Sequence, residues 1–91
     1  MSDKARVHFS RHARVRMEQR GATREEVRET VERGECVVGK DGRLGFRKVF
    51  SFEDIWQGKY WKTKQVSAIL REEAGKLKLE TVLVTYLCEV R

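Results

Sequence analysis

After Cys36 the hydrophobic residues follow a period of two, and no later stretch of the chain has the spacing of a helix. Alternate residues of a strand point to opposite faces of a sheet, so this segment predicts strands. Because no helix is available to carry a crossover, neighbouring strands are expected to pair in antiparallel fashion. The predicted strands are Cys36–Val38, Gly45–Phe52, Tyr60–Thr63, Gln65–Glu73 and Leu77–Glu89.

Two turn signals between these strands favour hairpins. Lys40–Arg43 contains an Asp-Gly pair, and Glu73–Lys76 carries a second turn signal. In the last strand, apolar residues occupy both sets of alternate positions from Val82 to Leu87. This pattern predicts a central strand that is buried on both faces at that point.

Two short helices precede the strands. Ser10 is a residue type that caps a helix by accepting a backbone hydrogen bond, and Gly21 ends this first helix. Thr23 opens the second helix with a capping box in which Glu26 supplies the carboxylate, and Gly34 ends it. Helices this short are not stable alone in water, so both are expected to pack against the sheet.

The chain is long enough for one hydrophobic core but not for two. It has 91 residues, with no proline and no internal repeat. We therefore predict a single α+β domain over residues 1–91. In this prediction, two N-terminal helices pack on one face of a twisted, mainly antiparallel sheet of about four strands.

The charge balance is strongly basic, with a formal net charge of +6 and a sequence pI near 9.7. Such a positive field favours polyanions, because binding releases the counterions that surround phosphates. Nucleic acid is therefore the expected partner class, and RNA is the expected partner. The alternative is that the charge serves only solubility.

The two cysteines, Cys36 and Cys88, have no spacing typical of a disulfide framework or a thiol redox motif, and reduced thiols are expected. The sequence contains no secretion leader and no apolar run near the length that crosses a bilayer. We expect a cytoplasmic protein without membrane contact.

His8 and His12 have an acceptable helical spacing for zinc, and with the two cysteines they make four candidate ligands. Zinc ligands normally come in close couples, whereas these cysteines are isolated, so no metal is expected. The glycines of the chain do not form a phosphate loop at the start of a helix. No cofactor is expected.

The first predicted helix carries His12, Arg16 and Arg20 at four-residue spacing, which places them in one row. Histidine is a residue type suited to proton transfer at neutral pH, which makes His12 a candidate, while the two arginines are suited to holding a phosphodiester. Tyr86 or Lys64 is a candidate for the second proton-transfer group. RNA cleavage needs no metal, because the adjacent 2′-hydroxyl is the nucleophile. The alternative is a structural row at the rim of the core.

Aromatic and basic residues are interleaved from Lys48 to Lys64, and this composition suits base stacking and phosphate contacts. Phe50 and Phe52 have the spacing of a strand's core face, so the better surface candidates are Trp56, Tyr60 and Trp61. The predicted nucleic-acid-binding residues are Lys59, Trp61, Lys62 and Lys64.

The first helix has the motif Ser-x-His-Ala-x-x-Arg-Met-x-x-Arg-Gly from Ser10 to Gly21, followed by the capping-box helix. This motif resembles that of a bacterial family of small proteins of unknown function, whose members are similar to the RelE-like ribonuclease-toxin superfold. Thr85 and Tyr86 match a Thr-Tyr pair that commonly ends the last strand in that family. Ala22 stands where a larger aliphatic residue is expected.

The resemblance implies a RelE-like fold and a metal-independent endoribonuclease of toxin type. In that interpretation the catalytic residues are His12, Arg16, Arg20 and Tyr86. It also implies a cognate antitoxin as a candidate protein partner, and a homodimer is compatible with it. Two alternatives stay open: a nucleic-acid-binding module without chemistry, and a protein-interaction domain.

Overall fold

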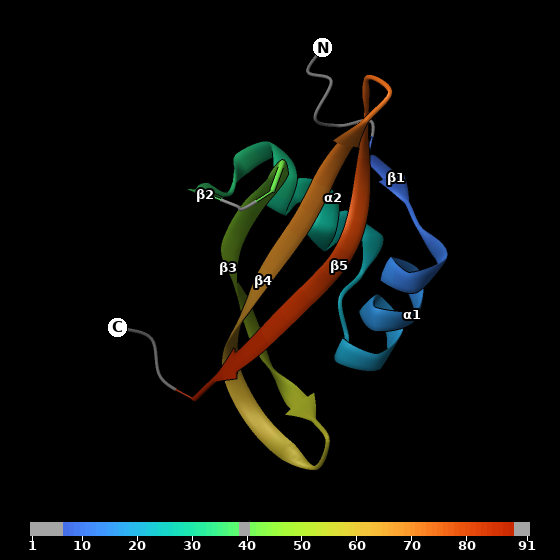
Figure 1. Ribbon diagram of the computed structural model, residues 1–91. Helices are drawn as coiled ribbons and strands as arrows, with labels where there is room; N and C mark the ends of the chain where they lie inside the picture. The colour runs from blue at the N-terminus through green and yellow to red at the C-terminus, as the bar shows by residue number, and fades with distance from the viewer. Residues whose placement is uncertain (1–6, 39–40, 89–91) are drawn as a thin grey trace.

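The computed structural model describes residues 7–38 and 41–88, which form two helices and one mixed sheet (Figure 1). The elements are β1 (Val7–Phe9), α1 (Arg11–Arg20), α2 (Arg24–Arg33), β2 (Glu35–Val38), β3 (Arg43–Trp56), β4 (Lys59–Glu73) and β5 (Lys76–Leu87). The α+β class is therefore confirmed. Neither of the described helices has the length and apolar content needed to cross a membrane.

The sheet has five strands in the order β1-β5-β4-β3-β2, so the expectation of about four strands is corrected. The additional strand is β1, which pairs in parallel with β5, from Val7 opposite Leu77 to Phe9 opposite Leu79. The other three strand pairs are antiparallel. A strand of three residues is too short to show a clear alternation of apolar and polar residues. Its hydrogen-bond partner also lies far away in the sequence, so no local signal indicates the pairing.

The segments Tyr60–Thr63 and Gln65–Glu73, predicted as two strands, form one continuous strand, β4. Lys64 interrupts the apolar pattern, yet its side chain is buried within the strand. β3 and β4 form a long hairpin whose end extends beyond the rest of the sheet (Figure 1). A register shift in β3 between Ser51 and Asp54 interrupts the pairing near that end.

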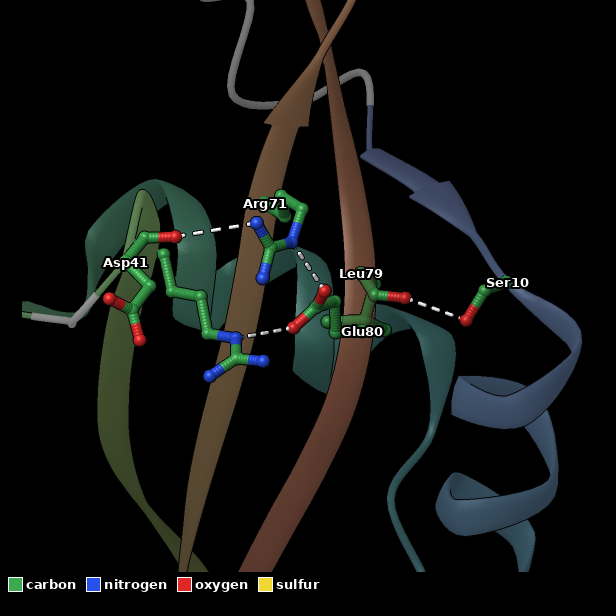
Figure 2. A network of polar contacts seen from close by, with 6 residues as sticks. Ser10, Asp41, Arg71, Leu79 and Glu80 are labelled. Atoms are coloured by element: carbon green, nitrogen blue, oxygen red, sulfur yellow. Dashed lines mark hydrogen bonds and ion pairs between the residues drawn. The ribbon is translucent and has the colours of Figure 1, made fainter.

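The predicted helix starts are confirmed. The hydroxyl of Ser10 accepts a hydrogen bond from the Ala13 N–H and donates one of 2.8 Å to the carbonyl of Leu79. This second bond ties the start of α1 to β5 and is drawn in Figure 2. Thr23 and Glu26 form the complete capping box of α2.

The helices and one face of the sheet enclose the core. Ala13 and Met17 of α1 and Val27 and Val31 of α2 are buried together with alternate residues of the central strands. Burial of β5 on both faces was predicted and is wrong. Val82 is fully buried, but Leu83 and Leu87 are exposed to 48% and 37% because no described element covers the second face of the sheet.

The uncovered face carries an ion-pair network centred on Glu80. Glu80 is the extra residue of a bulge in β5, and it accepts hydrogen bonds from Arg71 at 2.7 Å and Arg43 at 2.8 Å (Figure 2). The hydrogen bond from Arg71 is the main reason that the pKa of Glu80 is lowered. The network joins three neighbouring strands at the end of the sheet where β1 pairs.

Candidate nucleic-acid interface

Tyr86, near the end of β5, lies at the centre of an aromatic cluster formed by Phe52, Trp56, Trp61 and Tyr86. The ring of Trp56 stacks on that of Tyr86 with centroids 5.4 Å apart and an interplanar angle of 16°. Phe52 meets Tyr86 edge-on at 5.4 Å, and Trp61 is tilted at 6.0 Å. The cluster thus joins the end of the β3–β4 hairpin to β5, with geometry typical of favourable aromatic pairs.

The end of α1 is fitted against this cluster through Gly21. The Tyr86 hydroxyl donates a hydrogen bond of 2.8 Å to the carbonyl of Arg20. A Cβ on Gly21 would lie 2.5 Å from that hydroxyl oxygen and 2.9 Å from the Trp56 ring. Gly21 also has φ +79°, a conformation that favours glycine, so both space and backbone geometry require it.

Burial raises the pKa of the Tyr86 hydroxyl, and the negative charge of Glu26 raises it further. The phenol is therefore protonated at neutral pH and acts as a hydrogen-bond donor. In any proton transfer near neutrality it could give a proton but would be a poor base.

Two cations flank the aromatic cluster. One terminal guanidinium nitrogen of Arg20 donates a hydrogen bond of 2.6 Å to the carbonyl of Val82. A guanidinium has five N–H donors, so this bond leaves capacity for a phosphate. Lys59, in the hairpin, places its ammonium 4.6 Å from the centre of the Trp61 ring.

Both cations and every ring of the cluster except that of Phe52 line one open hollow of about 530 Å³, which we call the aromatic-basic hollow. Its walls come from the end of α1, the tip of the β3–β4 hairpin and the last residues of β5. Among the residues that line it are Gln19, Arg20, Trp56, Lys59, Trp61 and Tyr86. Four residues chosen from the sequence, Arg20, Lys59, Trp61 and Tyr86, are therefore brought together.

Lys64 occupies a different position from the one the sequence suggested. It is only 4% exposed, and its ammonium forms an ion pair of 2.9 Å with Glu26 and a hydrogen bond of 2.7 Å with the carbonyl of Gly21. It also lies over the Phe52 ring at 5.0 Å. Lys64, predicted as a nucleic-acid-binding and proton-transfer residue, is not among the residues that line the hollow, and its ammonium holds the turn between α1 and α2.

His12 and Arg16 do not reach the aromatic-basic hollow. His12 is exposed and lines a separate hollow of about 490 Å³, together with Lys78 and Glu80. Arg16 donates a hydrogen bond of 3.2 Å to the side chain of Gln19. The row predicted on α1 therefore spans two sites, and only Arg20 shares a hollow with Tyr86.

Other predicted residues lie outside the hollow as well. Lys62 is exposed but is not among the residues that line it. Cys36 and Cys88 are both free and exposed. Within residues 7–38 and 41–88, no three histidine, cysteine or acidic side chains gather as metal ligands would.

The sequence analysis missed the buried link from Lys64 through Gly21 and Glu26. A signal for it existed, because Lys64 shares its strand alternation with the buried residues Val66 and Ala68. A lysine at a core position of a strand requires an internal partner, and Glu26 on α2 supplies it.

The comparisons with known proteins identify the family of the chain. Residues 9–84 match the model of a family described as Domain of unknown function (DUF4258), so the chain belongs to this family. The matched residues run from the end of β1 into β5 and include both helices. No curated protein and no solved structure matches the chain.

Proposed function

We propose that this member of the DUF4258 family binds single-stranded RNA in the aromatic-basic hollow. The observation that carries the proposal is the convergence of two cations, Arg20 and Lys59, with the rings of Trp56, Trp61 and Tyr86 around one open hollow. Proteins that bind single strands combine a positive groove for the backbone with aromatic side chains on which bases stack.

The preference for a single strand follows from the stacking surfaces. A base can stack on a protein ring only when its face is not covered by a neighbouring base pair. The net charge of +6 adds a favourable field that acts on any polyanion. In this proposal Arg20 and Lys59 contact phosphates, and Trp61 offers its ring to a base.

The direct test is to measure the affinity of a short fluorescent RNA of mixed sequence over a range of salt concentrations. Lys59→Ala is expected to weaken binding and to reduce the salt slope by about one, because one phosphate contact is lost. Lys76→Ala is the matched control, since Lys76 is an exposed lysine at the opposite end of the sheet. An equal effect of both variants would show diffuse attraction and contradict the proposed hollow.

A second candidate function is metal-independent cleavage of RNA in the same hollow. The observation that favours it is the pairing of Arg20 with Tyr86, a protonated phenol at neutral pH. Arg20 would hold the phosphodiester while the adjacent 2′-hydroxyl attacks phosphorus and loses its proton to water. As the bond from phosphorus to the 5′-oxygen breaks, Tyr86 would protonate that leaving oxygen. His12 lines the other hollow, so in this candidate function it takes no part in proton transfer beside Tyr86.

This second candidate is tested by incubating RNA in EDTA with the wild-type protein, Tyr86→Phe and His12→Ala, and by reading fragments on a denaturing gel. Fragments from wild type and His12→Ala, but not from Tyr86→Phe, would support cleavage in the aromatic-basic hollow. RNA that stays intact in all three samples, while wild type binds it, would leave binding without chemistry.

A further inference from the structure

Among the strands that the structure describes, none pairs with the outer edge of β5 over most of its length. Strand β1 pairs with β5 only at Leu77–Leu79, and β5 continues to Leu87 (Figure 1). Among residues 7–38 and 41–88, no strand pairs with this edge beyond Leu79. Unpaired edges are templates for a further strand, and natural proteins usually cover or blunt them.

The backbone of this edge points toward α1. The carbonyl of Val82 accepts the hydrogen bond from Arg20, so it faces away from β4. In an antiparallel pair the N–H and carbonyl of every second residue point to the same side, so Val84 and Tyr86 also present their backbone groups outward. Val84 and Tyr86 line the aromatic-basic hollow, which opens along the edge.

The charge beside the edge selects the occupant. Arg20, at the end of α1, and Lys59, in the β3–β4 hairpin, both line the hollow beside this edge. A second copy of the chain would bring the same cations against one another. An extended segment with acidic side chains would instead pair with them while its backbone completes the sheet.

We propose that the edge of β5 from Val84 to Tyr86, beyond the Val82 carbonyl that Arg20 holds, receives an extended acidic peptide of a protein partner as an added strand. The unpaired backbone favours a peptide over a nucleic acid at this edge, because only a peptide forms a ladder of N–H to carbonyl bonds. The peptide would occupy the mouth of the aromatic-basic hollow, and its exclusion of RNA there rests on the proposed function.

The experiment uses the full chain and a short peptide that alternates glutamate with valine, in the absence of RNA. Binding is followed by shifts of the backbone amide signals and by their hydrogen exchange. Strand addition is expected to shift the signals of Val84 and Tyr86 and to slow their exchange. The same peptide with lysine in place of glutamate is expected to produce no shifts.

A third peptide separates strand addition from charge attraction alone. It keeps the glutamates but carries N-methyl groups on alternate residues, so it cannot complete the ladder, and binding is expected to be lost. Val84→Pro is a second test, on the protein side, because it removes an outward N–H that the ladder needs. Proline is tolerated where a strand N–H faces outward, so the sheet is expected to stay intact while binding of the acidic peptide is lost. Equal binding of the methylated peptide, no binding of the acidic peptide, or a dimer paired through β5 would each overturn the inference.

Discussion

The hydroxyl of Tyr86 donates a hydrogen bond of 2.8 Å to the carbonyl oxygen of Arg20. This contact joins the last strand to the last residue of α1, and it places the phenol ring against Trp56 below Gly21. The backbone of Arg20 is held by Tyr86 while its guanidinium is held by the carbonyl of Val82. These two hydrogen bonds therefore fix the position of the Arg20 guanidinium relative to the Tyr86 ring at the wall of the aromatic-basic hollow.

Tyr86→Phe removes this hydroxyl and keeps the ring. We expect the free energy of unfolding to fall by about 1 kcal/mol, because one hydrogen bond to a partly buried carbonyl is lost. Urea unfolding at neutral pH measures the change. Tyr60→Phe is the matched control on the exposed hairpin and should unfold like the wild type; an unchanged midpoint for Tyr86→Phe would show that the bond adds no stability.

The raised pKa of Tyr86 gives this difference a pH dependence. The folded state binds the phenolic proton more tightly than the unfolded state, whose pKa is near the ordinary 10.0. The stabilising contribution is therefore complete below pH 10.0 and is lost as the pH rises through the higher folded pKa. Unfolding of wild type and Tyr86→Phe, compared at neutral and strongly alkaline pH, should show the two variants converging.

Gly21→Ala combines backbone strain with a steric clash. The left-handed conformation at φ +79° costs a residue with a Cβ about 1–2 kcal/mol, and the new Cβ also meets the Tyr86 hydroxyl at 2.5 Å. Gly58→Ala is a close control, because Gly58 has the same φ of +79° and no atom within 4 Å of its would-be Cβ. Gly21→Ala should destabilise the protein more in urea unfolding and change tryptophan fluorescence; equal losses would contradict the close fit.

Lys64→Met tests the buried link to the turn between the helices. The substitution leaves Glu26 and the Gly21 carbonyl without their shared donor, and breaking such a buried pair costs about 3 kcal/mol. Lys62→Met, two residues away and exposed, should change stability by no more than about 0.5 kcal/mol. Chemical unfolding compares the two variants. A loss for Lys64→Met no larger than the control's would mean that the link contributes nothing.

Glu80→Gln tests the network on the uncovered face. The pKa of Glu80 is lowered, mainly by the Arg71 hydrogen bond, so its charged form stabilises the folded state above the ordinary value of 4.5. This stabilisation is lost as the pH falls through the lower folded pKa. Glu80→Gln should therefore be less stable than wild type at pH 7, and the gap should close in acid. A gap that is independent of pH would exclude the carboxylate charge as its cause.

The local features of the chain were determined by the sequence itself. Ser10 and Thr23 start the two helices where their side chains can satisfy free backbone N–H groups, and alternation after Cys36 identifies strands. These signals depend on neighbours within a few residues, so they are readable without a fold. The aromatic and basic composition of Lys48–Lys64 also indicated Lys59 and Trp61, which line the hollow.

Only the tertiary structure decided how these features meet. Val7–Phe9 becomes a strand because Leu77–Leu79 offers a parallel edge, and no local pattern carries that pairing. The row of His12, Arg16 and Arg20 is continuous along α1 in the sequence. In the structure its two ends line different hollows: Arg20 lines the aromatic-basic hollow with Tyr86, and His12 lines the other one. Lysine is a residue type that usually lies at the surface. Lys64 is buried because Glu26, on a different element, pairs with its ammonium. Contacts between distant segments set these positions, because hydrogen-bond and ion-pair partners that are far apart in the sequence meet only when the chain folds.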